Sequence, residues 1–111
     1  VRVQTVMRAA VSTVGEAVVD AVDGVVDLAA VGTLHGDLVR VIRRHPGETL
    51  IVDLDGVESI DDAGLGVLMG AAATARSTGG DLQVVCNRTA LRARLESMRF
   101  DRAVDVRSTI S

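Results

Sequence analysis

The middle of the chain changes from strand-like to helix-like hydrophobic spacing within a few residues. Leu50 to Leu54 is a short apolar run typical of a strand buried on both faces, and Asp55-Gly56 follows it as a turn signal. Apolar residues then recur at helical spacing, which predicts a helix with one face on the sheet through Leu65, Leu68, Met69, Ala72 and Ala73. The segment between them, Asp55 to Gly66, is predicted to be an acidic loop and the working surface of the protein.

The start of this helix carries two adjacent acids. Asp61 or Asp62 is expected to cap the first turn, because a carboxylate there accepts unpaired backbone N–H bonds and meets the positive end of the helix dipole. Gly64 and Gly66 are expected to let another backbone come close.

The same patterns predict elements along the rest of the chain. Strands are expected at Arg2 to Val6, Leu82 to Cys86 and Ala103 to Val106, and a further strand is expected from Ala17 to Val22 followed by Gly24 to Leu28, with a glycine at its centre. Further helices are expected from Val31 to Ile42, ended by His45-Pro46-Gly47, and from Leu91 to Met98, capped by Asn87; Gly79-Gly80 ends the Leu65 helix. This order predicts a single domain over residues 1–111, a small open α/β sheet whose helix-linked strands pair in parallel.

Composition restricts the chemistry. All 12 basic residues are arginine, and the lack of lysine argues against phosphate-loop nucleotidases, Schiff-base enzymes and phospho-acceptor receiver domains. Phe100 is the only aromatic residue and the net charge is −3, so we expect no direct binding to nucleic acid. With one cysteine, no targeting signal and no long apolar run, we expect a cytoplasmic protein without membrane insertion.

Candidate catalytic and metal-binding residues are few. No nucleophile arrangement and no phosphate-binding glycine loop is present, so we expect a protein that is not an enzyme and needs no cofactor. His35 and His45 have no companion ligands at metal-binding spacing. The acids Asp53, Asp55, Asp61 and Asp62 suggest a metal cluster only weakly, because a Mg²⁺ receiver pocket of this sort normally includes a lysine.

Cys86 closes an apolar strand and has two interpretations. It is most simply a small core residue, and a strand-end position also permits a redox role through an intermolecular disulfide.

One segment resembles a known family. Ile51 to Leu68 is similar to the signature of the STAS domain family, whose best-known soluble members are bacterial anti-sigma factor antagonists. The resemblance extends to Gly24-Val25-Val26-Asp27-Leu28, to Gly79-Gly80-Asp81-Leu82 and to Leu95 through Phe100. It implies a STAS-like fold, an open mixed sheet with helices packed on it.

The family's phosphorylation site differs here. The family loop typically reads Asp-Ser-Ser-Gly, and its first serine is phosphorylated by the partner anti-sigma factor, a protein kinase. This chain has Asp61-Asp62-Ala63-Gly64, so Asp62 stands at the acceptor position and cannot be phosphorylated as serine. Asp62 either mimics phosphoserine, which would hold the protein in its inactive form, or is accepted by the partner, which would leave the protein permanently active. Ser59 is the remaining loop hydroxyl, either a turn residue or a relocated acceptor.

The resemblance implies a function in sigma factor regulation. The chain would bind a kinase-like anti-sigma factor and so indirectly release a sigma factor for transcription. The implied partner-binding residues are Asp27, Ser59, Asp61, Asp62, Ala63, Gly64, Leu65 and Gly66. Two alternatives stay open: a STAS subunit of a transporter or of a sensory or stress-signalling assembly, and a receiver that takes a phosphoryl group on Asp53, Asp61 or Asp62.

Overall fold

The computed structural model describes residues 6–110. Five strands form one sheet in the order β1-β2-β3-β4-β5, with bounds Arg8–Val14, Ala17–Val26, Thr49–Ile60, Asp81–Val85 and Asp105–Arg107. The helices are the 3-10 turn η1 (Leu28–Ala30), α1 (Val31–Arg44), α2 (Asp62–Ser77), α3 (Thr89–Ser97) and α4 (Phe100–Ala103). Strand β1 is antiparallel to β2, and the other neighbouring strands pair in parallel. The predicted small, open, mixed α/β sheet with parallel helix-linked strands is confirmed.

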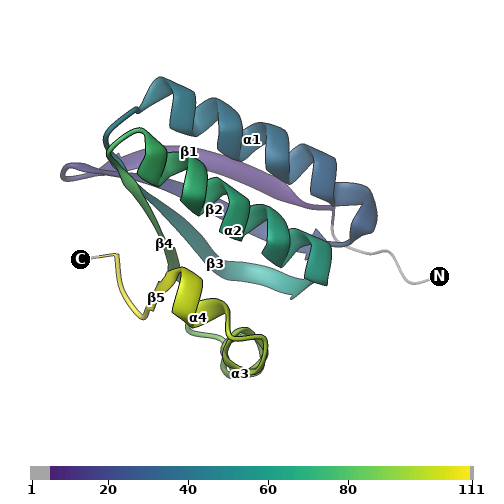
Figure 1. Cartoon of the computed structure of the whole chain (residues 1–111). Coiled ribbons are helices and arrows are strands. Elements are labelled where there is room, and N and C mark those ends of the chain that lie inside the picture. The colour runs from purple at the N-terminus through teal and green to yellow at the C-terminus, as the bar shows by residue number, and fades with distance from the viewer. Residues whose placement is uncertain (1–5, 111) are drawn as a thin grey trace.

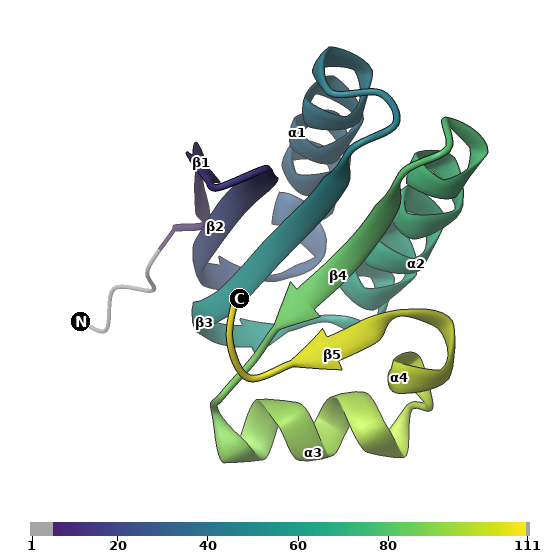
Figure 2. The same cartoon turned by 90° about the vertical axis from the view of Figure 1, so that its left-hand side faces the viewer.

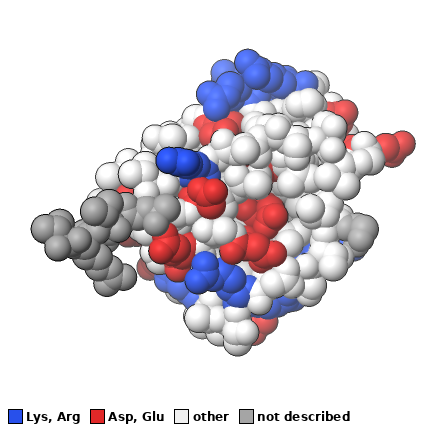
Figure 3. Space-filling view, turned by 180° about the vertical axis from the view of Figure 1, so that it is seen from behind, with Lys and Arg blue, Asp and Glu red and all other residues white. Residues whose placement is uncertain are grey.

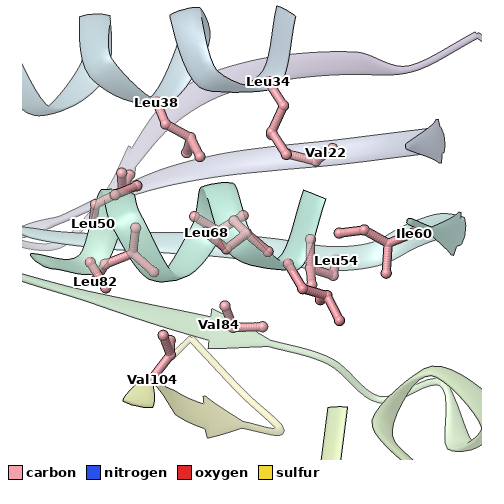
Figure 4. Close-up of a cluster of buried hydrophobic side chains, with 14 of the residues drawn as sticks. Val22, Leu34, Leu38, Leu50, Leu54, Ile60, Leu68, Leu82, Val84 and Val104 are labelled. Atoms are coloured by element: carbon pink, nitrogen blue, oxygen red, sulfur yellow. The ribbon is translucent and has the colours of Figure 1, made fainter. Parts of the chain in front are cut away.

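The helices are unequally distributed around the sheet. Helices α1 and α2 lie side by side on one face, whereas α3 lies beyond the carboxyl end of β4 (Figures 1 and 2). The main core fills the space under α1 and α2, where Leu34 points toward Val22 of β2 and Leu38 points toward the same strand (Figure 4). A small second cluster, formed by Val19, Ile51 and Val85, lies on the opposite face. Alternation along β2 and β3 produces both clusters, because successive side chains point to opposite faces.

The prediction of a loop from Asp55 to Gly66 is wrong. Strand β3 continues to Ile60, and Asp61 alone separates it from α2. The pairing register with β2 shifts twice in this part of β3, which marks two β-bulges. Gly56 belongs to the first bulge, since a Cβ there would lie 2.7 Å from the Cβ of Asp23. The Asp-Gly pair that resembles a turn signal therefore serves a close approach between two strands.

The first strands also differ from the prediction. The expected strand from Arg2 to Val6 falls largely outside the described residues, although Val6 makes an isolated parallel bridge with Val25. The edge strand is β1, which was not predicted, because its side chains are almost all exposed and show no hydrophobic alternation. Strand β2 passes without a break through Gly24, where φ is +88°. A Cβ at this position would lie only 2.5 Å from the carbonyl oxygen of Val6, so the close approach of the two backbones requires glycine.

Helix α1 and its ending at His45 are confirmed, but the buried face of α2 is rotated from the predicted one. Met69 is 40% exposed and Ala73 is also exposed, whereas Ala71 and Ala75 are buried beside Leu65, Leu68 and Ala72. Alanines occur on both faces of this helix, so their positions in the sequence do not indicate which face is buried. The packing against α1 decides which alanines are covered.

Two features of the last third were not predicted correctly. Asn87 does not cap α3, whose N-cap is Arg88 without a side-chain bond. The single-turn helix α4 precedes the last strand, and one turn is too short to leave a periodic pattern.

Candidate functional site

Asp61 fixes the start of α2. Its carboxylate accepts the N–H of Ala63 at 3.0 Å, and its own N–H donates to the carbonyl of Val26 at 2.8 Å. The first bond is an N-cap, so of the two acids offered by the sequence Asp61 is the cap. The second bond joins the end of β2 to the start of α2, which brings Asp27 next to the same edge.

Removing this cap should destabilise the protein. Asp61→Ala leaves the N–H of Ala63 without its acceptor, and we expect the free energy of unfolding to fall by about 0.5–2 kcal/mol in urea titrations. Asp61→Asn and Asp61→Ser retain a side-chain acceptor and should recover most of this loss. Equal stability of Asp61→Ala and wild type would contradict the capping role.

Asp62 occupies the first turn of α2 and pairs with an arginine of the same chain. Its carboxylate accepts a hydrogen bond from Nη2 of Arg94 on α3, and 68% of the Asp62 side chain stays exposed. The Arg94 side chain is 34% exposed, and its Nε–H is buried without an acceptor. Such a half-exposed pair stabilises a fold by only about 0–1 kcal/mol. Its main effect is local, since it places a positive charge beside the exposed carboxylate.

Asp27 and Ser59 lie near the carboxyl ends of β2 and β3. Asp27 directly follows β2 and caps η1 by accepting the N–H of Ala30 at 3.0 Å. Ser59 pairs with Val25 in the bulged end of β3, and its side chain is exposed. An apolar hollow of about 300 Å³ lies beside Asp27, lined by Val6, Met7, Val25, Ala29, Ala30 and Thr33. Leu28 next to it is 71% exposed.

The remaining predicted partner-binding residues divide by burial. Gly64 and Leu65 are buried, and a Cβ on Gly64 would lie 2.9 Å from Ile60. Gly66 is exposed with open space at its Cβ position, and Ala63 is half-buried. Gly64 therefore permits close packing against side chains of its own fold, and Gly66 makes no close backbone approach. The site residues that face outward are Asp27, Ser59, Asp61, Asp62 and Gly66.

Asn87 and Asp55 form a second polar junction. Asp55 accepts the backbone N–H of Asn87 at 2.6 Å and its side-chain amide at 2.9 Å, and the same amide donates to the carbonyl of Ser108 at 2.8 Å. Arg88 donates to the carbonyl of Val57 at 3.1 Å. These bonds tie the middle of β3 to the segments that follow the carboxyl ends of β4 and β5. Asn87 is 32 positions from Asp55 and 21 from Ser108, so no local sequence pattern predicts these contacts. The pair of Asp62 and Arg94, also 32 positions apart, could not be predicted for the same reason.

The acidic residues do not converge on a metal site. Within residues 6–110 no group of three or more His, Cys, Asp and Glu side chains could hold a metal ion. Asp53 accepts the N–H of Asp55 at 2.9 Å, so its carboxylate holds the local backbone.

Acidic side chains gather on the face of the sheet opposite α1 and α2 (Figure 3). Side chains alternate along each strand, so Asp23 shares this face with Val19, and Asp53 shares it with Ile51.

Cys86 lies in the core and is fully buried. Burial raises the pKa of its thiol above the ordinary value of 9.0. Since the thiolate is the reactive form, both features disfavour redox chemistry at this residue in the folded protein, and its redox role stays a prediction.

We expect Cys86 to react with a thiol-modifying reagent only as fast as the protein opens. The reaction of the folded protein should therefore be much slower than that of the chain in denaturant, because access requires local or global unfolding. Absorbance kinetics with an aromatic disulfide reagent measure both rates. Equal rates would show that the thiol is accessible in the folded protein and would support the redox hypothesis.

In the described part of the chain, no helix is long and apolar enough to cross a membrane. No functionally curated protein matches the sequence closely.

Solved structures share the fold. An anti-sigma factor antagonist from Mycobacterium paratuberculosis is 22% identical with a TM-score of 0.84, over 95% of this chain and 88% of that one. The anti-sigma factor antagonist SpoIIAA of Bacillus, in its unphosphorylated form, is 16% identical with a TM-score of 0.73, over 89% and 87%. The murine Solute Carrier 26 family member A9 anion transporter is 17% identical with a TM-score of 0.70, and the match covers 89% of this chain but 17% of the transporter.

The family comparison covers nearly the whole chain. The sequence model described as "Mlab, STAS domain" matches residues 9–107. The mixed five-stranded sheet, the helices on it and this match agree, and the chain belongs to the STAS domain family.

Proposed function

We propose that this STAS domain is a protein-interaction module that binds a kinase-like anti-sigma factor and so releases a sigma factor for transcription in the bacterial cytoplasm. The observation that carries the proposal is the exposed start of α2, where Asp61 and Asp62 stand beside Asp27 at the end of β2. The similarity of the fold to anti-sigma factor antagonists supports it. The activity is recognition and needs neither a catalytic group nor a cofactor.

The charge of this surface defines the partner that fits it. Asp27, Asp61 and Asp62 are three exposed acids at this surface. A complementary partner face carries arginine or lysine side chains or a helix N-terminus, because opposite potentials raise the association rate and fix the docking register.

The pair between Asp62 and Arg94 favours a permanently active protein over a phosphoserine mimic. Phosphoserine carries a charge of about −1.5 to −2 and three acceptor oxygens. Asp62 carries a single charge, and Arg94 already compensates it within the chain. The surface offered to a partner is therefore closer to an unphosphorylated antagonist than to a phosphorylated one. Control would then depend on abundance or on a separate signal.

Partner capture tests the proposal. Immobilised wild-type protein, Asp62→Arg and Asp62→Ser are each incubated with lysate of the source organism, and bound proteins are identified by mass spectrometry. We expect wild type and Asp62→Ser to retain an anti-sigma factor and Asp62→Arg to lose it. Capture of no anti-sigma factor by wild type, with a purified candidate also failing to bind, would refute the function.

A second candidate function uses the same surface in another assembly. The fold also matches a small part of an anion transporter chain, which supports a role as the STAS subunit of a transporter or of a sensory or stress-signalling assembly. In the same capture experiment, transporter or sensor subunits lost by Asp62→Arg would favour this candidate.

A further inference from the structure

Asp20 lies inside the core between β2 and α1. It is fully buried in the row of β2 that faces the helices, between Val18 and Val22. Its sheet neighbours, Val11 of β1 and Val52 of β3, are apolar. Neither of its carboxyl oxygens accepts a hydrogen bond from the described residues. An ionised carboxylate in such a place is very unfavourable, so this environment selects the neutral acid.

Asp37 reaches the same place from α1. It is 7% exposed, its Oδ1 accepts a hydrogen bond from Arg40 at 3.1 Å, and its Oδ2 is buried without a donor. The Asp20 carboxyl is within hydrogen-bond reach of Asp37. Two carboxyl groups can bond only when one of them carries a proton, and the guanidinium of Arg40 balances the charge of Asp37. A proton on Asp20 gives that carboxyl an O–H that can donate to the buried, unpaired oxygen of Asp37.

We propose that Asp20, Asp37 and Arg40 form a proton-dependent clamp between β2 and α1, which closes when Asp20 is protonated and loosens α1 when that proton is lost. The bond crosses from the middle of the sheet to the middle of the helix. Helix α1 follows directly on η1, whose N-cap is Asp27, so the clamp steadies one side of the candidate site. This inference concerns the fold and does not depend on the proposed function.

The titration range follows from the surroundings of Asp20. Burial and the contact with Asp37 raise the pKa of Asp20 from 3.8 to about 8, and the charge of Arg40 opposes this only in part. Asp37 and Arg40, both on α1, are the charged groups that act on Asp20 within residues 6–110, since β1 and β3 present valines. A surface hollow of about 340 Å³, lined partly by Gly32, Gly36, Asp37 and Arg40, gives solvent a route toward the pair.

The sign of the pH dependence is fixed by linkage. The unfolded chain releases the Asp20 proton near its ordinary pKa of 3.8, whereas the folded protein keeps it up to about pH 8. Between these values the folded state binds more protons, so this group makes the protein less stable as pH rises. Its stabilising effect is complete at about pH 4 and below, and is lost at about pH 8 and above.

Urea unfolding of wild type and Asp20→Asn at several pH values tests the clamp. The variant keeps a donor toward Asp37 without a titrating proton. We expect the ratio of the wild-type unfolding constant to that of the variant to rise by about tenfold per pH unit between about pH 5 and 7. The ratio should become constant above about pH 8. Asp23→Asn, which replaces an exposed acid on the same strand, is the matched control for the loss of one carboxylate. A ratio for Asp20→Asn that stays constant with pH, or that changes no more than the ratio for the control, would overturn the proposal.

A measurement on the unsubstituted protein keeps the proposal testable if Asp20→Asn fails to fold. The ¹³C signal of the Asp20 carboxyl should titrate near pH 8, with backbone amide signals of α1 shifting at the same midpoint. Asp37→Asn should lower that midpoint, because it removes the neighbouring negative charge. Titration of Asp20 near pH 4, or α1 amides that do not respond, would overturn the clamp.

Discussion

Charge reversal at Asp62 is expected to weaken binding to the anti-sigma factor by about 100-fold. Asp62→Arg places a positive charge at the positive end of α2 and beside Arg94, on a surface that we propose meets a basic partner. A like-charge contact in an interface costs several kcal/mol, and about 2.7 kcal/mol corresponds to this loss. Titration calorimetry with the purified partner measures it. Because a half-exposed ion pair adds only about 0–1 kcal/mol to folding, the variant should stay folded.

A matched charge reversal distinguishes an effect of this site on binding from an effect of the protein's net charge. Asp101 is an exposed acid in the first turn of α4, so Asp101→Arg makes the same change at another helix start. It should alter affinity by less than about threefold, as expected for a charge outside the interface. Asp62→Ser should bind nearly as well as wild type, because the family's unphosphorylated loop has serine there. Equal affinities of Asp62→Arg and Asp101→Arg would exclude the start of α2 as the contact surface.

Gly80→Ala is expected to lower the free energy of unfolding by about 3 kcal/mol, near the upper end of the usual cost of overpacking. Gly79 and Gly80 end α2 in a Schellman motif: Gly80 N–H donates to Ala75 at 3.1 Å and Gly79 N–H to Arg76 at 3.0 Å. A Cβ on Gly80 would lie 2.2 Å from the carbonyl oxygen of Glu48. Backbone atoms must move to relieve this contact, and they belong to the turn that starts β3. Urea titration gives the loss directly.

Gly70→Ala is the matched control for this substitution. Gly70 lies inside α2, and its Cβ position has no atom within 4 Å. Alanine there should raise stability by about 0.5–1 kcal/mol, since glycine is the weaker helix former. Opposite signs at Gly70 and Gly80 would establish that the close approach to Glu48 causes the effect. A stabilised Gly80→Ala protein would show that the turn has room for a side chain.

Much of the candidate site could be predicted from the sequence, because its residues are consecutive. The pair Asp61-Asp62 before a helical pattern predicts a capped, negatively charged helix start, and Asp61 is that cap. The partner of Asp62 could not be predicted, since Arg94 is 32 residues away on another helix. The sequence predicts a loop before Asp61, because Asp55-Gly56 is a turn signal locally. Only pairing with β2 shows that Gly56 belongs to a bulge.

The sequence by itself determined the order of the central elements from β2 to α3, the parallel pairing of helix-linked strands and the absence of a phosphorylatable serine at position 62. These follow from local spacing, residue type and chain connection. Only the tertiary structure decided which side chains meet across elements. The buried pair of Asp20 with Asp37 and the junction of Asp55 with Asn87 are examples. Hydrophobic periodicity records which face of an element is buried. It carries no information about the partner of a polar group, because that depends on how distant segments pack.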